Sequence, residues 1–436
     1  MKNIKRILMQ NITELVSNRE QYVQESEKDF RRNRKLSFET MIYSILSLGS
    51  RDLKCEIMDR FGIQADIPSV SAFVQRRGKI SSATFETLFR NFVHSAYEPK
   101  PYNGYRLLAV DGSDLHVPTN PKETRSYYPG ANGQKHYNLL HLNAMYDLNN
   151  RIYTDALVQH SREANEHKAF TTMVDRDDCK LPTVYIADRG YEAYNNLAHI
   201  QEKGQYFLIR IKDVASHNGI AQGLSLPASK EFDVPFSVNL TRKQTNAAKA
   251  DINLKYLSHG VIFDYLPTKC KKSIPVTPYT ISLRIVRFQL SEDNFETLIT
   301  NLPASDFSSR DLKQLYALRW GIETSFRALK YTLGLIYFHS KKTEFILQEI
   351  FAKLTMYNFA ELITSHVIIQ HKKRKHPIKV NFSASVHICS KFLLKNIPPS
   401  EIEALISRFL VPIRHAVSRD RKMSVKHAVS FLYRIA

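Results

Sequence analysis

Two short apolar segments that each end in an aspartate constrain this chain most strongly. Residues 107–110 (Leu-Leu-Ala-Val) lead into Asp111, and residues 182–187 lead into Asp188 in the same way. Short apolar runs bounded by turn residues are typical of buried strands. Ligands bind beyond the carboxyl ends of strands in open α/β sheets, so both aspartates are candidate site residues. Either one alone could also be a simple turn, because Asp-Gly often follows a strand for that reason.

The chain between the two aspartates predicts a hairpin and a helix. Residues 137–146 and 151–159 have strand patterns and flank a turn at 147–150, which indicates a β-hairpin. Residues 161–174 have a helical pattern. Strands and a helix in this order predict an α/β fold with a mixed sheet and flanking helices.

The charge of the chain is strongly positive. It carries 62 Lys and Arg against 42 Asp and Glu, which gives a formal net charge of +20. Residues 371–436 hold 14 of the basic residues and only 3 acidic ones. Such a field favours polyanionic partners, nucleic acid before an anionic membrane. The run 371–376 and the group Arg414, Arg419, Arg421 and Lys422 are candidate contacts to a DNA backbone, and a solvated loop is the alternative for the first.

Several other classes of protein are disfavoured. The four cysteines are far apart and no Cys/His pair has metal-ligand spacing, so neither a disulfide framework nor a zinc module is supported. The first residues are too polar for a signal peptide, and no apolar run is long enough to span a bilayer. We therefore expect a soluble cytoplasmic protein without a membrane partner.

A basic segment near the N-terminus has two interpretations. Residues 69–79 follow Pro68, which suits a helix start, and they carry Arg76, Arg77 and Lys79. This segment could be the recognition helix of a helix-turn-helix. It could equally be one helix of a small bundle with solvated arginines.

The segment that starts at Ser308 predicts a helix with a polar face. Ser308 and Asp311 have capping-box-like spacing. At about 100° per residue, Tyr316, Arg319, Glu323 and Lys330 fall within a stripe roughly 60° wide. An apolar stripe lies beside it. A carboxylate between two cations and a phenol is unusual for a plain surface, although a solvated face with salt bridges would have the same spacing.

These residues resemble a known family. The pattern Tyr316-x2-Arg319-x3-Glu323-x6-Lys330 fits the signature of the insertion-sequence four (IS4-like) transposases without a gap. Residues 184–191, with Asp188-Arg189-Gly190-Tyr191, resemble the second aspartate block of that family, and residues 108–113 resemble the first. Asn165-Glu166 and residues 339–342 are similar too. The resemblance covers roughly residues 30–425.

The resemblance implies an RNase H-like core with an Asp-Asp-Glu triad, interrupted by a β-rich insertion. It implies that Asp111, Asp188 and Glu323 hold two divalent ions, Mg²⁺ or Mn²⁺, which prefer carboxylate oxygens. The expected regions follow. They are a helical DNA-binding region at 1–100, the first part of the core at 101–204, a β-rich insertion at 205–294, the rest of the core at 295–370, and a basic helical C-terminal region at 371–436.

The resemblance also implies roles for neighbouring residues. Tyr316, Arg319 and Lys330 would contact phosphates of the transposon end, with Arg319 able to hold one bidentately. Arg189 is a further phosphate candidate or an ordinary ion-pair partner. Trp320 would stack on a base or pack in the core. Asp114 competes with Asp111 for the first position of the triad.

The implied function is that of a DNA transposase, which cleaves transposon ends and joins the freed 3′-hydroxyl to target DNA. The resemblance further implies a cut-and-paste route and a homodimer in a synaptic complex. A transposase-derived DNA-binding protein without activity is one alternative. A metal-dependent nuclease that hydrolyses without strand transfer is another. A prokaryotic cytoplasmic location, with nucleoid association on DNA, is expected.

Overall fold

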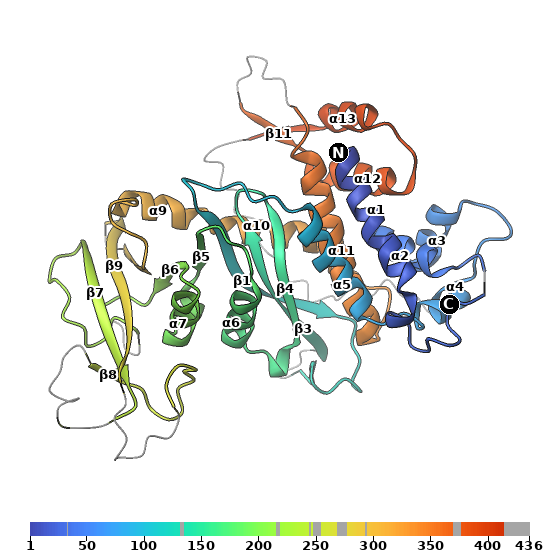
Figure 1. Cartoon of the computed structure of the whole chain (residues 1–436). Coiled ribbons are helices and arrows are strands. Elements are labelled where there is room, and N and C mark those ends of the chain that lie inside the picture. Colours follow the sequence, from blue (N-terminus) through green and yellow to red (C-terminus); the bar gives the residue numbers. More distant parts are fainter. Residues whose placement is uncertain are drawn as a thin grey trace.

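In the computed structural model, the described residues are 1–413 without 33, 131–134, 215–218, 244–245, 247–253, 268–276, 293 and 369–375. The described part is an elongated α/β protein (Figure 1), with helices at one end, a mixed sheet in the middle and long strands at the other end. The predicted DNA contacts at 371–375 and from Arg414 onward lie outside the described residues.

The first hundred residues form helices, as predicted. They are α1 (Lys2–Ser17), α2 (Phe38–Ser47), α3 (Leu53–Phe61), α4 (Val70–Arg77) and α5 (Ala83–Ala96), with a 3-10 turn at Arg19–Gln21. Three of these helices start at a side-chain cap, because Ser37, Asp52 and Ser69 each accept a hydrogen bond from a backbone N–H in the first turn.

The basic segment on α4 packs into the protein core. Arg77 is fully buried, and its guanidinium donates hydrogen bonds to Gln348 and Glu349 of α11 (Thr343–Thr364). Arg76 stacks over the ring of Phe30, 4.3 Å from its centroid. These contacts favour the helical-bundle interpretation of α4 over the recognition helix, since Arg77 cannot reach a DNA groove from the core.

The central sheet has the predicted mixed topology. Its core strands are β1 (Arg106–Val117), β3 (Tyr137–Asp147), β4 (Ile152–His160), β5 (Thr183–Ala187) and β6 (Tyr206–Ile211). They are hydrogen-bonded in the order β4-β3-β1-β5-β6, antiparallel as far as β1 and parallel from β1 to β6. The predicted hairpin is thus β3–β4. The short strand β2 (Tyr127–Tyr128) also pairs with β3.

The sheet continues beyond β6 into long outer strands. They are β10 (Asn294–Thr300), β9 (Tyr279–Ser291), β7 (Phe232–Thr241) and β8 (Leu254–Tyr256), paired in that order. The β-rich character predicted for this stretch is therefore present. However, β6 pairs with β5 and β10 pairs with β6, so backbone hydrogen bonds run without interruption from the central strands to the outer ones. The expected region boundaries remain predictions.

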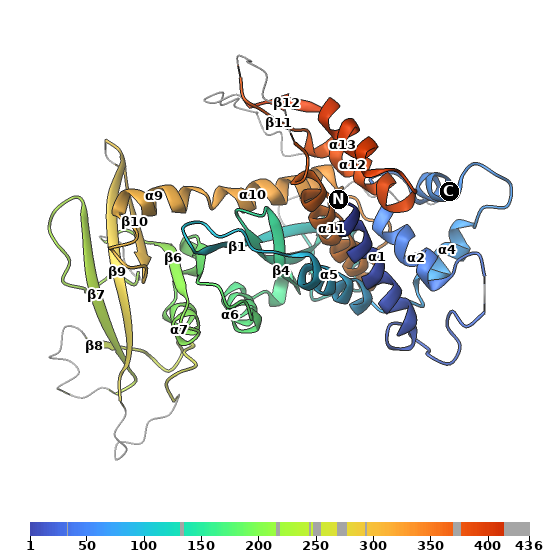
Figure 2. The ribbon, with the colours of Figure 1, turned by 45° about the horizontal axis from the view of Figure 1, so that its top comes forward.

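Each face of the sheet is covered by different helices (Figure 2). Leu108 and Val110 of β1 pack against α6 (Glu166–Arg176) and α7 (Tyr194–Glu202). Ala109, one residue between them, lies on the opposite face with α10 (Trp320–Arg327) and α11. Strand residues alternate between faces. Asp111 therefore belongs to the α10 face, and Gly112 and Asp114 belong to the α6 face.

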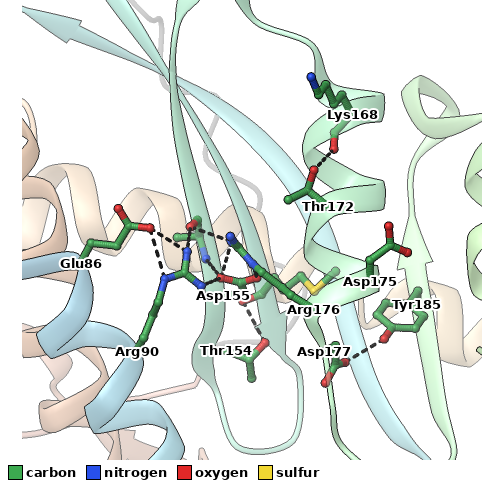
Figure 3. A network of polar contacts seen from close by, with 12 residues as sticks. Glu86, Arg90, Thr154, Asp155, Lys168, Thr172, Asp175, Arg176, Asp177 and Tyr185 are labelled. Carbon is green, nitrogen blue, oxygen red and sulfur yellow. Dashed lines mark hydrogen bonds and ion pairs between the residues drawn. The ribbon is translucent and has the colours of Figure 1, made fainter. Parts of the chain in front are cut away.

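An ion-pair network ties α6 to the N-terminal helices (Figure 3). Asp155 of β4 is 8% exposed and accepts hydrogen bonds from Arg90 of α5, at 3.0 Å, and from Nη2 of Arg176 of α6, at 2.6 Å. Asp177, which follows α6, pairs with the buried Arg106 and accepts a hydrogen bond from Tyr185. These contacts fix the C-terminal end of α6, and with it the direction of the whole helix.

The helix predicted from Ser308 begins as expected but is not continuous. Ser308 and Asp311 form a capping box at the start of α9 (Ser309–Ala317). A short break separates α9 from α10, and a π-helical turn (Ala328–Thr332) follows α10. Because a π turn holds more residues than an α turn, Lys330 is displaced from its predicted place in the helical stripe.

The C-terminal described residues form α12 (Phe382–Leu394) and α13 (Pro399–Arg408) with a small ladder of β11 (Ile378–Val380) and β12 (Leu410–Pro412). Helix α11 is buried along almost its whole length and packs against α5, α2 and α12. In the part of the chain that the structure describes, no helix is long and apolar enough to cross a membrane.

Candidate active site

The strand pairing places the two aspartates next to each other. Val110 of β1 pairs in parallel with Ala187 of β5, and Asp111 and Asp188 are the residues that follow them. Asp188 caps a 3-10 turn (Arg189–Tyr191) by accepting a 2.8 Å hydrogen bond from the N–H of Gly190. Asp111 accepts one of 2.8 Å from the N–H of Gly112. Asp188 thus follows the end of β5, as the sequence predicts. The predicted strand end at Asp111 is wrong, because β1 continues to Val117 by pairing with β3, and only its parallel pairing with β5 ends before Asp111.

Glu323 faces Asp111 from α10. Both residues line a cleft of about 370 Å³ together with Gly112, Lys330 and Tyr331. The apolar side of α10 packs on the sheet through Ile322 and Phe326, which are buried. Helix packing therefore aims Glu323 at Asp111 in the middle of β1.

Arg319 lies between two members of the predicted triad. Its Nη2 is 2.9 Å from Oε1 of Glu323, and its Nη1 is 3.9 Å from Oδ2 of Asp111. The side chain of Arg319 is 8% exposed, and its Nε has no hydrogen-bond partner among the described residues. The hydroxyl of Tyr316, over which Arg319 stacks, is also buried without a described partner. The site thus contains buried donors that an incoming acceptor would satisfy.

The pKa of Asp111 reflects its burial and the charged groups around it. Burial, together with the nearby charges of Asp188 and Glu323, raises the pKa of Asp111 to about 6. The Gly112 N–H and the Arg319 guanidinium act in the opposite direction. A carboxyl group held in this way gains from a cation placed beside it.

The donor set suits a hard divalent ion. Asp111, Asp188 and Glu323 offer only carboxylate oxygens, which Mg²⁺ and Mn²⁺ prefer. Among the described residues, no three His, Cys, Asp or Glu side chains are already spaced around one ion position.

The other predicted residues differ in their exposure. Lys330 lines the cleft and is half-buried, and burial lowers its pKa while the charge of Asp114 raises it. Trp320 is 61% exposed, which excludes the core-packing alternative for this residue. Arg189 is exposed and forms no ion pair with a described residue, so the ion-pair alternative is not supported. Both side chains remain accessible to a ligand.

Sequence reasoning missed a second charged cluster beside the triad. Asp114 of β1 and His141 of β3 are cross-strand partners, and Oδ1 of Asp114 lies 2.8 Å from Nδ1 of His141. Nε2 of His141 lies 2.9 Å from Oε1 of Glu166, the first residue of α6. These contacts raise the pKa of His141 to about 9 against the effect of burial. Strand alternation predicts where Asp114 faces, but the approach of α6 is a tertiary contact.

Comparison with known proteins identifies the family of this chain. Residues 102–359 match the family described as transposase DDE domain. The transposase InsG for insertion sequence element IS4 of Escherichia coli (strain K12) is 23% identical over 395 residues, which is 86% of this chain and 80% of that protein. A transposase for insertion sequence element IS231E of Bacillus thuringiensis subsp. finitimus is 22% identical over 331 residues, covering 67% of this chain and 64% of that protein.

Among solved structures, a cryo-EM structure of the piggyBac transposase synaptic complex with hairpin DNA covers 96% of this chain and 86% of that chain, at a TM-score of 0.42 and 11% identity. At that score the likeness is too distant to assign the fold.

The family that matches residues 102–359 comprises metal-dependent enzymes of DNA strand cleavage and joining. The family match covers more than half of the chain, so the chain belongs to the transposase DDE domain family, and the resemblance to IS4-like transposases is confirmed. It is a transposase.

Proposed function

We propose that Asp111, Asp188 and Glu323 are the catalytic residues and the ligands of two divalent ions, Mg²⁺ or Mn²⁺. One observation carries this proposal. Strand register brings Asp111 and Asp188 together, helix α10 aims Glu323 at them, and the pKa of Asp111 rises to about 6. When bound, such ions activate an oxygen nucleophile and stabilise the leaving oxygen of a phosphodiester.

The surrounding side chains would hold the DNA. Arg319 and Tyr316 offer buried donors without described partners, and Arg319 would exchange its contact with Glu323 for a phosphate. Lys330 supplies a positive charge inside the cleft. Arg189 and Trp320 are exposed, and we assign Arg189 to a phosphate and Trp320 to stacking on a base.

The reaction proposed is cleavage at transposon ends followed by attack of the freed 3′-hydroxyl on target DNA, by cut-and-paste. The relatives named for insertion sequence elements support a mobile element of that kind as the substrate. The strand order β4-β3-β1-β5-β6, with both aspartates directly beyond the last parallel pair of β1 and β5, supports the proposal of an RNase H-like core. We further propose a homodimer on DNA, since two ends must be cut and joined together.

Site variants test the assignment. Asp111→Asn, Asp188→Asn and Glu323→Gln should each abolish Mg²⁺-dependent cleavage of a duplex that carries the inverted repeat flanking this gene. Glu163→Gln, an exposed glutamate outside the site, should cleave normally. Full cleavage by Glu323→Gln would reject the triad. A pre-cut end that gives no joined product would indicate a nuclease, and a wild-type chain that binds the end without cutting it would indicate an inactive DNA-binding protein.

A further inference from the structure

Glu166 carries a carboxylate close to the proposed metal site that the triad does not use. It is the first residue of α6, and its backbone position is fixed because Asn165 caps the helix by accepting a 2.9 Å hydrogen bond from the N–H of Lys168. The Arg176 ion pairs with Asp155 hold the other end of the same helix (Figure 3). Glu166 is therefore presented to the sheet by a helix anchored at both ends.

The two glycines that follow the aspartates leave room for this carboxylate. A Cβ at Gly112 would lie 2.8 Å from Oε1 of Glu166 and 2.4 Å from Nε2 of His141. A Cβ at Gly190 would lie 3.9 Å from Oε2 of Glu166 and 3.0 Å from Oδ1 of Asp188. One carboxylate thus reaches from the backbone beside Asp111 to the backbone beside Asp188. Any side chain at position 112 would close that approach.

The contacts of Glu166 leave part of its carboxylate free. Nε2 of His141 lies 2.9 Å from Oε1, but the ring N–H is not directed well enough to make a hydrogen bond, so the contact is an ion pair. No described residue donates a hydrogen bond to Oε2. Since His141 also pairs with Asp114, the imidazolium is shared between two carboxylates and does not saturate either.

A buried hydroxyl without a partner points to a ligand in the same place. Tyr191 is 1% exposed, and its hydroxyl has no hydrogen-bond partner among the described residues. Burial raises the pKa of Tyr191, and the charges of Glu166, Asp111 and Asp188 raise it further. The ring of Tyr191 packs on Phe170 of α6, with the centroids 5.3 Å apart, so its hydroxyl lies at the α6 face of the sheet, within reach of the charges of these three carboxylates. A buried donor of this kind is costly unless something that enters the site satisfies it.

We infer that Glu166 is a fourth carboxylate of the divalent-metal site, acting beside Asp111 and Asp188 from the α6 face of the sheet. The inference rests on the proposed function, because it extends the same metal site. His141 and Asp114 are then positioning residues: the imidazolium offsets the added negative charge in the absence of metal and holds Glu166 against β1.

Mn²⁺ titration of the full chain without DNA tests this inference. Calorimetry should show that Glu166→Gln lowers Mn²⁺ affinity by about tenfold or more, since even the substitution of a residue that only orients a metal ligand costs about that much. The matched control Glu163→Gln, an exposed glutamate in the preceding turn, should bind as the wild type does. Asp188→Asn is titrated in parallel. Wild-type affinity in Glu166→Gln together with weakened affinity in Asp188→Asn would overturn the role of Glu166 alone, whereas wild-type affinity in both would reject the triad itself.

A second measurement needs no substitution. Fe²⁺ is bound in place of Mn²⁺ and hydrogen peroxide is added. Fe²⁺ is oxidised to Fe³⁺ and reduces the peroxide to hydroxide and a hydroxyl radical, which cuts the backbone next to the ion, and added ascorbate returns Fe³⁺ to Fe²⁺. We expect cuts near Asp111 and Asp188, and also at the start of α6 around Glu166. Cuts at the two aspartates with an intact α6 would overturn the inference even if the Glu166→Gln chain did not fold.

Discussion

Arg319 donates a 2.9 Å hydrogen bond to Glu323, one helical turn further along the chain. The same guanidinium lies 3.9 Å from Asp111, so a positive charge already sits between two carboxylates that we assign to metal ions. In the absence of DNA this arginine offsets their repulsion. When DNA binds, a phosphate would accept the hydrogen bonds of the Arg319 guanidinium. The two carboxylates would then be free to bind the metal ions.

Arg319→Ala should therefore bind Mn²⁺ more tightly in the absence of DNA, by roughly threefold to tenfold, since the competing charge is gone. The same variant should lose cleavage activity, because the phosphate contact is lost too. Calorimetry and a cleavage assay measure the two effects. Arg319→Lys, which retains the positive charge, should keep the weaker Mn²⁺ affinity of the wild type. Arg310→Ala, at an exposed arginine of α9, is the control. Equal Mn²⁺ affinity in Arg319→Ala and wild type would show that the arginine does not compete.

Asp111 and Asp114 should separate clearly in activity. Asp111 lies on the α10 face with Glu323, whereas Asp114 lies on the other face with His141. Asp111→Asn should abolish Mg²⁺-dependent cleavage, while Asp114→Asn should retain a measurable fraction of it, because only a positioning contact is lost. Single-turnover cleavage rates provide the comparison. If Asp114→Asn lost cleavage while Asp111→Asn kept it, the roles assigned to the two aspartates would have to be exchanged.

The buried ion pair between Arg77 and Glu349 should be a major determinant of stability. Both side chains are 1% exposed, and His339 also contacts Glu349. Glu349→Gln leaves the Arg77 charge uncompensated in the core, so we expect a loss of about 3–5 kcal/mol in the free energy of unfolding. Urea denaturation measures it. Glu344→Gln, an exposed glutamate on the same helix, should change stability little, and a similarly small effect of Glu349→Gln would contradict the prediction.

Glu361 should make stability depend on pH. Burial raises the pKa of Glu361 to about 7, against the effects of Arg151 and Lys379. Because the folded-state pKa lies above the ordinary value of 4.5, the contribution of this group is fully present below pH 4.5 and is lost as the pH rises through about 7. Glu361→Gln, which cannot ionise, should be more stable than the wild type at pH 8 but not at pH 4.5. Thermal unfolding of both proteins at both pH values measures the effect. If the stability difference between Glu361→Gln and the wild type were the same at pH 8 and at pH 4.5, the raised pKa would be ruled out.

Local signals predicted much of the fold. The hairpin at β3–β4, the strand that ends before Asp188, and the cap at Ser308 depend on residues near in sequence, and all are present. The strand that leads into Asp111 is present too, but it continues to Val117 because β3 pairs with it beyond the predicted end.

Tertiary contacts account for what sequence reasoning did not reach. The burial of Arg77 depends on Glu349, which is 272 residues away. The break before Arg319 and the π turn after Arg327 arise where α9 and α10 adapt to different parts of the sheet. The contact of Glu166 with His141 depends on how α6 packs. None of these has a periodicity that sequence alone could reveal.

The uninterrupted backbone pairing from β5 through β6 and β10 to β9 has a consequence for engineering this protein. A shortened chain without β9, β7 and β8 would leave β10 as a bare edge strand, with unpaired N–H and C=O groups two strands away from β5, which leads into Asp188. Exposed edges of this kind template aggregation between chains. Miniaturised variants would therefore need charged or proline residues on β10, or a new cover for it, before their solubility matched that of the full chain.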